Sequence, residues 1–199
     1  MKSRGCQLAI NNVEKIKLGK FNERILEQHI MKVMFCCGLF DAFCGSYEHT
    51  YFCRSQVRHG TYPKNFENPN LAGHRYIAIV NMIMDKTSKI TVNNSYTRDM
   101  GNLMRFPIVE NDPDNFAGAL DRLLNKMSPG QECMYCKPAT EEYRIGLMER
   151  GYTDAEFYPE TVLGEKKIAS LFAKGAEILD LPTEFKPHSL RGACITMIF

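Results

Sequence analysis

The sequence predicts an α+β fold that is mainly helical and carries a small three-stranded antiparallel sheet. Three observations lead to this prediction. Apolar residues recur at helical spacing in both halves of the chain, and short strand-like segments lie between them. In addition, 44% of the 199 residues are hydrophobic and 24% are charged, as in an ordinary globular domain with a sizeable core.

A buried helix is predicted over residues 22–44, or two helices with a break near Gly38. Asn22 is a suitable N-cap, and acidic residues follow it in the first turn. Residues 55–73 are polar and contain two prolines and two glycines, so we expect a loop there. The apolar residues of the helix fall largely at helical spacing: Ile25, Leu26, Ile30, Val33, Met34, Leu39 and Phe40.

Three short strands are predicted next, at residues 75–84, 89–94 and 103–108. The turn sequence DKTS separates the first two strands. The second strand alternates polar and apolar residues, which is typical of a strand with one buried face. We expect these three strands to form the antiparallel sheet.

The rest of the chain is predicted to be helical for the most part. Residues 112–127 read as a capped amphipathic helix, and residues 128–160 as irregular chain with a helix at 140–150. The clearest helical periodicity lies over residues 164–181. Pro182 ends that helix, and a last helix begins near Pro187.

Bulk properties restrict the classes of partner. The formal net charge is only +2, so any binding to nucleic acid has to come from a local basic patch. The N-terminus lacks the apolar segment of a signal peptide, and the longest apolar run, residues 33–40, is too short to cross a bilayer. We therefore expect a nuclear or cytoplasmic protein without a membrane partner, whose eight cysteines are reduced.

The sequence FKPHSLRG, residues 185–192, carries the most specific motif. Pro187 and Ser189 are helix-start signals, and in such a helix His188 and Arg191 share one face. Helix N-termini favour anions, and an arginine fork matches phosphate geometry. The segment is either a phosphate clamp with a proton donor beside it or an ordinary capped helix with two polar surface residues.

With this order of elements, the motif resembles the catalytic domain of tyrosine recombinases, most closely the crypton type found in eukaryotic mobile elements. HSLR, followed by small residues and Thr196, is similar to the second conserved box of that family. Residues 1–20 would then be an N-terminal extension and residues 21–199 the recombinase-like domain. Further counterparts to the family's segments are residues 45–52, 89–108, 116–129 and 157–172.

The resemblance implies DNA breaking and rejoining through a tyrosine nucleophile, with no cofactor and no small-molecule substrate. Arg191 and His188 would stabilise the attacked phosphate, and Arg98 would occupy the place of the hairpin lysine, with Lys89 as an alternative. Such enzymes act as homo-oligomers on DNA. The residues that we predict to contact DNA phosphates are Arg191, Lys89, Arg58 and Lys166.

Two departures from the family pattern put cleavage in doubt. The first-box arginine should precede Glu48 by three or four residues, where Gly45 and Cys44 stand instead. No tyrosine follows Tyr158, so the nucleophile is missing from its usual place. We therefore expect a truncated or decayed copy that does not cleave DNA, and the alternative is a domesticated domain that binds DNA or protein.

A third hypothesis is a small zinc-binding interaction module built on the Cys-x-x-Cys sequence at 133–136. A structural zinc site needs four ligands, and no second spaced pair is present. We therefore expect no metal and interpret these cysteines as buried free thiols. Glu48 and His49 are either an acid/base pair or structural residues that position the end of a helix.

Overall fold

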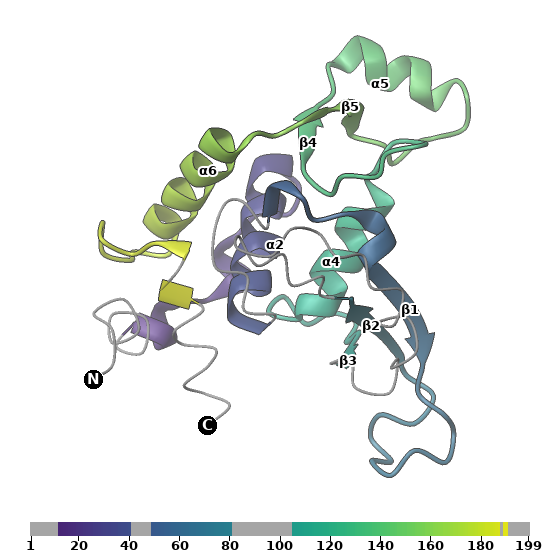
Figure 1. Cartoon of the computed structure of the whole chain (residues 1–199). Coiled ribbons are helices and arrows are strands. Elements are labelled where there is room, and N and C mark those ends of the chain that lie inside the picture. Colours follow the sequence, from purple (N-terminus) through teal and green to yellow (C-terminus); the bar gives the residue numbers. More distant parts are fainter. Residues whose placement is uncertain (1–11, 41–48, 81–104, 188, 191–199) are drawn as a thin grey trace, which may run out of the picture.

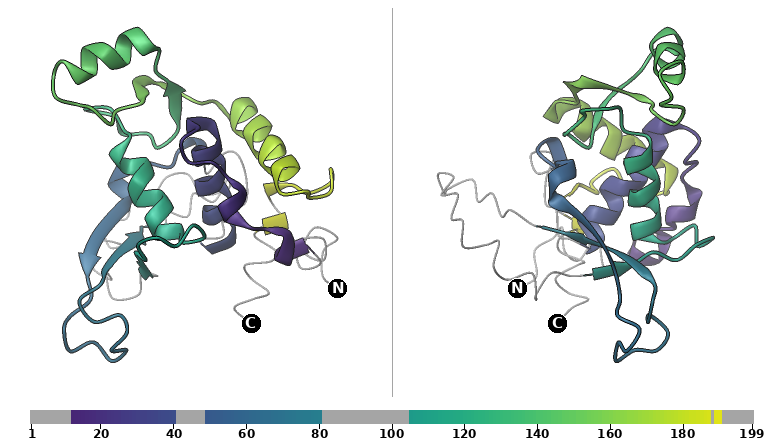
Figure 2. Two further views of the ribbon diagram at one scale, coloured as in Figure 1. Left: turned by 180° about the vertical axis from the view of Figure 1, so that it is seen from behind. Right: turned by 90° about the vertical axis from the view of Figure 1, so that its right-hand side faces the viewer.

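The computed structural model describes residues 12–40, 49–80 and 105–187, together with residues 189 and 190 (Figure 1). The central helix α2 lies between α6 on one side and α4 with the three-stranded sheet on the other, and both views of Figure 2 agree with this arrangement. The α-helices and strands are α2 (Leu26–Phe40), β1 (Val57–Thr61), β2 (Arg75–Ile79), β3 (Arg105–Pro107), α4 (Phe116–Asn125), β4 (Cys136–Pro138), α5 (Glu141–Met148), β5 (Phe157–Val162) and α6 (Glu165–Ile178).

Helix α2 forms the centre of the core, which confirms the predicted buried helix. Every residue from 29 to 39 is buried, including the polar residues His29 and Lys32. The helix begins at Leu26 and not at residue 22, because the Asn22 side chain accepts a hydrogen bond from the Arg24 N–H and closes a turn before the helix. The predicted residues 41–44 lie outside the described part of the chain.

The three-stranded antiparallel sheet is confirmed, in the order β1-β2-β3, but its first strand is not the predicted one. The prediction of a loop over 55–73 is wrong at β1. Only Val57 of the five β1 residues is buried, so the strand shows no apolar alternation in the sequence. The predicted strand at 89–94 lies outside the described residues, as do residues 81–84 and 103–104. Strands β2 and β3 lie within the ranges predicted at 75–84 and 103–108.

A second, two-stranded sheet corrects the expectation of irregular chain over 128–160. Strands β4 and β5 pair antiparallel and flank α5, which confirms the helix expected near 140–150. The Thr140 hydroxyl accepts the Tyr143 N–H and caps α5. Strand β4 has only three residues, too few to show a period-two pattern.

The C-terminal helices agree with the sequence. Helix α4 begins after Asn115, whose side chain accepts the Gly118 N–H, and α6 ends before Pro182. Residues 187, 189 and 190 are helical, as predicted for a helix beginning near Pro187. Its first turn is closed reciprocally, because the Ser189 N–H donates to the Lys186 carbonyl and the Lys186 N–H donates to the Ser189 hydroxyl.

Within the described part of the chain, no helix combines the length and the apolar character that crossing a membrane requires.

Candidate nucleic-acid interface

Most of the predicted site residues, namely Arg191, His188, Arg98 and Lys89, lie outside the described residues. Two predicted phosphate contacts, Arg58 and Lys166, are described, and both are exposed. Arg58 belongs to β1, whereas Lys166 belongs to the first turn of α6. These two elements lie on opposite sides of α2 (Figure 2), so the structure does not place Arg58 and Lys166 on one surface.

The strand register gives Arg58 a basic neighbour that the sequence did not indicate. Arg58 pairs with Ala78 of β2, and Ala78 pairs with Arg105 of β3. Side chains of directly paired residues project from the same face of a sheet, so the two arginines share a row, about 10 Å apart across two strand spacings. Helix α4 packs on the other face, so this row lies on the outer face of the sheet.

Tyr76 lies on the same outer face and contacts the row. Its ring crosses Gly60, its partner on β1, and a Cβ at that glycine would lie 2.9 Å from the Tyr76 Cε1 atom. The Arg105 guanidinium lies 5.2 Å from the centre of the Tyr76 ring, a cation–π distance. The Tyr62 ring, 4.8 Å from that of Tyr76, supports it from the loop after β1. The outer face therefore presents Arg58 and Arg105 near the Tyr76 ring, which packs over Gly60.

Replacing Gly60 by alanine is expected to swing the Tyr76 ring off the sheet and to lower the free energy of unfolding by about 1 kcal/mol. The cost stays modest because the clash involves the far end of the Tyr76 side chain, which is half-buried and not in the core. Urea unfolding measures the change, and Gly146→Ala is the control. A Cβ at Gly146 in α5 meets nothing within 4 Å, so that variant should gain about 0.5–1 kcal/mol. A gain in both variants would contradict the packing of Tyr76 on Gly60.

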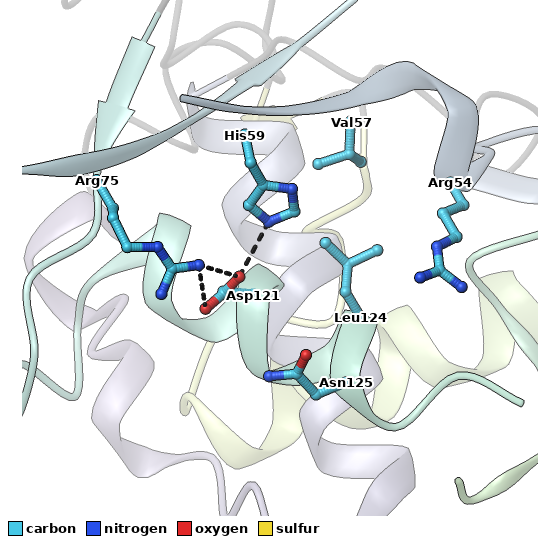
Figure 3. A pocket seen from close by; sticks show the side chains of 7 residues that line it. All are labelled: Arg54, Val57, His59, Arg75, Asp121, Leu124 and Asn125. Carbon is cyan, nitrogen blue, oxygen red and sulfur yellow. Dashed lines mark hydrogen bonds and ion pairs between the residues drawn. The ribbon is translucent and has the colours of Figure 1, made fainter. Parts of the chain in front are cut away.

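The inner face of the sheet and helix α4 enclose a cleft of about 360 Å³ (Figure 3). The Asp121 carboxylate of α4 lies 3.0 Å from Nε2 of His59 and accepts a hydrogen bond of 3.3 Å from Nη2 of Arg75. Arg54 lies at the other end of the cleft (Figure 3). The cleft is also lined by Val57, Leu124 and Asn125.

This cleft is charge-balanced at one end, which makes it less suited to phosphate than the outer face. Asp121 offsets the positive charge of Arg75 and would repel an anion that approached His59. His59 belongs to β1 and Arg75 to β2, and both side chains project towards the Asp121 carboxylate. Asp121 was missed because one acidic residue on the polar side of an amphipathic helix carries no signal of its own.

His49, a candidate acid/base group, is almost completely buried. Its ring lies 5.8 Å from that of Tyr135. Burial lowers the pKa of His49 to about 3, so the imidazole is neutral at physiological pH. These observations support the interpretation of His49 as a structural residue.

The cysteines at 133–136 lead into strand β4 and not into a helix. The described residues contain no group of three or more histidine, cysteine, aspartate or glutamate side chains that could hold a metal ion. Cys136 is buried, and its thiol donates towards the carbonyl oxygens of Cys133 and Pro159 at 3.5 and 3.6 Å. Its contacts are those of a packed thiol.

No protein-family model matches the chain, and comparisons with curated proteins and with solved structures also find no match. Support for a recombinase-like domain therefore comes from the sequence motifs, and support for a binding surface comes from the geometry of the sheet.

Proposed function

We propose that this chain binds the sugar–phosphate backbone of DNA as a recombinase-like domain. The observation that carries the proposal is the row of Arg58 and Arg105 on the outer face of the sheet. Both side chains are exposed, and both project from strands, which hold a charged group more precisely than a loop does.

Local charge supports the same surface. Residues 49–80 contain four arginine or lysine residues and a single acid, Glu67, although the net charge of the whole chain is only +2. The strands β1 and β2 and their connecting loop extend away from the helices (Figure 1), which leaves this basic segment open to a large partner. The four basic residues are Arg54, Arg58, Lys64 and Arg75.

The arginines of the row retain donors for phosphate. Arg58 Nη1 donates to the carbonyl oxygens of Ser55 and Val57, which directs the guanidinium along β1. A guanidinium has five N–H groups, so others stay open to a ligand. The Arg105 guanidinium lies over the Tyr76 ring, and this cation–π contact takes up none of its N–H donors.

The test is the affinity of the full chain for a fluorescein-labelled DNA duplex, measured by anisotropy over a salt series. The double variant Arg58→Ala/Arg105→Ala is expected to bind at least roughly tenfold more weakly and to reduce the slope of log K against log salt by about 2. The matched control is Lys137→Ala/Arg150→Ala, which removes two exposed charges from β4 and the turn after α5. Equal losses in both double variants would mean that only total charge matters and would overturn the assignment.

Two further variants in the same titration test the other predicted contacts. Arg191→Ala is expected to weaken binding, because the resemblance to tyrosine recombinases implies that this arginine contacts the phosphate. Lys166→Ala is compared with Lys167→Ala, since the Lys167 ammonium already pairs with Glu27 at 2.7 Å. If α6 contacts DNA, Lys166→Ala lowers the affinity for DNA more than Lys167→Ala does.

The recombination chemistry is a separate part of the proposal. Residues 187, 189 and 190 are helical, and Leu190 packs against Gly38 of α2. A nicked suicide duplex that traps a phosphotyrosyl link tests for strand cleavage. We expect DNA binding without a covalent product, because Cys44 and Gly45 stand where the family has its first-box arginine.

A further inference from the structure

Cys53 and Cys133 face each other across two segments that lie 80 positions apart in the sequence. They form an isolated antiparallel bridge that belongs to neither sheet. Cys53 directly precedes the 3-10 helix η3 (Arg54–Gln56), which leads into β1, and Cys133 lies shortly before β4. The bridge therefore joins the segment that leads into β1 to the segment that leads into β4 of the second sheet.

The hydrogen bonds around the bridge define the geometry of the pair. The Arg54 N–H donates to the Glu132 carbonyl at 2.7 Å, and the Met134 N–H donates to the Phe52 carbonyl at 2.9 Å. Bonds from the flanking residues, and none between the two cysteines, identify a non-hydrogen-bonded pair. In such a pair the Cα atoms lie about 4.5 Å apart and the side chains approach most closely. That separation falls inside the range of Cα distances that disulfides span.

Both thiols are also reachable. The Cys53 thiol donates a hydrogen bond of 3.3 Å to the Tyr51 carbonyl oxygen, which oxidation to a disulfide would remove. Both residues are half-buried, whereas the other described cysteines, Cys36, Cys37 and Cys136, are buried. A small oxidant therefore reaches this pair more readily than it reaches the thiols of the core.

We propose that Cys53 and Cys133 form a reversible disulfide and that glutathione disulfide is a sufficient oxidant. One protein thiolate attacks a sulfur of glutathione disulfide, which breaks that S–S bond and releases one glutathione thiolate. The second protein thiolate then attacks the protein sulfur of the mixed disulfide and releases the second glutathione. Overall, the two protein thiols lose two electrons and two protons, and one glutathione disulfide becomes two glutathione thiols.

The bond would add a covalent link to a junction that hydrogen bonds already join. The Glu132 carboxylate accepts a 3.0 Å hydrogen bond from the Ser55 N–H, and Arg54 at the edge of the cleft follows Cys53 directly. A covalent link at this place holds η3 and the start of β1 against the segment that leads to β4. It also closes a long loop in the unfolded chain, which stabilises the folded state.

Rate measurements have to allow for the acidity of the thiols. Burial, with the neighbouring Cys133 and Glu132 as further causes, raises the pKa of Cys53 to about 11, so little of its thiolate exists at neutral pH. Oxidation is therefore followed at pH 8.5 as well as at pH 7, and it should be faster at pH 8.5.

The experiment treats the folded full chain with glutathione disulfide, alkylates the remaining thiols and maps the peptides by mass spectrometry without reduction. The expected result is a linked peptide pair that contains Cys53 and Cys133, together with a Tm that rises by several degrees and returns after dithiothreitol. Cys53→Ser and Cys133→Ser are each expected to lack both the linked pair and the shift. Failure to find the linked pair in the folded wild-type protein at pH 8.5 would overturn the proposal.

Cys136→Ser is the matched control, because Cys136 offers the competing partner in the Cys-x-x-Cys sequence. A serine hydroxyl can donate to the carbonyl oxygens that the Cys136 thiol meets, so this variant should fold and keep the link between Cys53 and Cys133. A product that joins Cys133 to Cys136, or loss of the shift in Cys136→Ser, would show that the proposed pair is wrong.

Discussion

Replacing Glu23 by alanine is expected to lower the free energy of unfolding by about 3–5 kcal/mol, because it leaves a buried lysine without its anionic partner. The Glu23 carboxylate accepts a hydrogen bond of 2.6 Å from Nζ of Lys32 and two from Arg122, at 2.6 and 2.8 Å. The Lys32 side chain is only 2% exposed. In the variant, its ammonium keeps the Pro113 carbonyl oxygen as a hydrogen-bond acceptor but loses its anionic partner.

Urea unfolding at pH 7 measures this loss, and Glu27→Ala is the control. Glu27 also forms ion pairs, with Lys167 at 2.7 Å and Lys174 at 3.8 Å, but its side chain is 36% exposed. An exposed pair contributes less than about 1 kcal/mol, so the control should change little. Similar losses in the two variants would show that the burial of Lys32 does not determine the energy of the Glu23 cluster.

The same cluster predicts a pH dependence. Burial alone would raise the pKa of the Glu23 carboxyl, but hydrogen bonds from Arg122 and Lys32 outweigh it and lower the pKa to about 2. The unfolded chain takes up this proton near pH 4.5 and the folded chain only near pH 2, so the stabilisation is complete above pH 4.5 and is lost as the pH falls to 2. The stability difference between wild type and Glu23→Ala should narrow over this interval.

Phe35→Ala is expected to cost about 3–5 kcal/mol, because it opens a cavity where α2 meets α6. The Phe35 side chain is completely buried, and its ring stacks on that of Phe172 of α6 at 4.5 Å. A Cβ at Gly175 would lie 2.7 Å from the Phe35 Cε2 atom, so this glycine forms the notch that receives the ring. The exposed apolar residue Met148 provides the control, since Met148→Ala removes a side chain that is 51% exposed.

A double-mutant cycle isolates this contact. Gly175→Ala should cost about 1–3 kcal/mol in the wild type, because a buried ring has to move. In the Phe35→Ala background the ring is absent, and alanine is the better helix former, so the same change should be neutral or stabilising. If the changes in the free energy of unfolding were additive, Gly175 would not form the notch for the Phe35 ring, because residues in direct contact are expected to couple.

The helices show what sequence patterns predict well. Residues 164–181 and 112–127 repeat apolar residues at helical spacing between recognisable stop and start signals, and α6 and α4 lie within these ranges. The strands show where the patterns fail. The β1 sequence VRHGT contains one apolar residue, and its extended conformation depends on hydrogen bonds to β2, not on its own composition.

The candidate surface was predicted in part, through Arg58. Arg105 was not predicted, because it lies 47 positions away in the sequence and reaches the row only through the pairing of both strands with β2. Lys166 was predicted to contact phosphate together with Arg58. The sequence did not indicate that α2 lies between Lys166 and the sheet. Spacing along a chain predicts which residues share a face within one element, but it does not predict which elements pair.

The sequence by itself determined the α+β class, the buried central helix, the two amphipathic helices and the start of a helix at Pro187, because each depends on interactions between residues a few positions apart. The tertiary structure alone decided three features. They are the row that joins Arg58 to Arg105, the pairing of His59 and Arg75 with Asp121, and the contact of Cys53 with Cys133. Each brings together segments at least 46 positions apart, and cross-strand hydrogen bonds and core packing set their register.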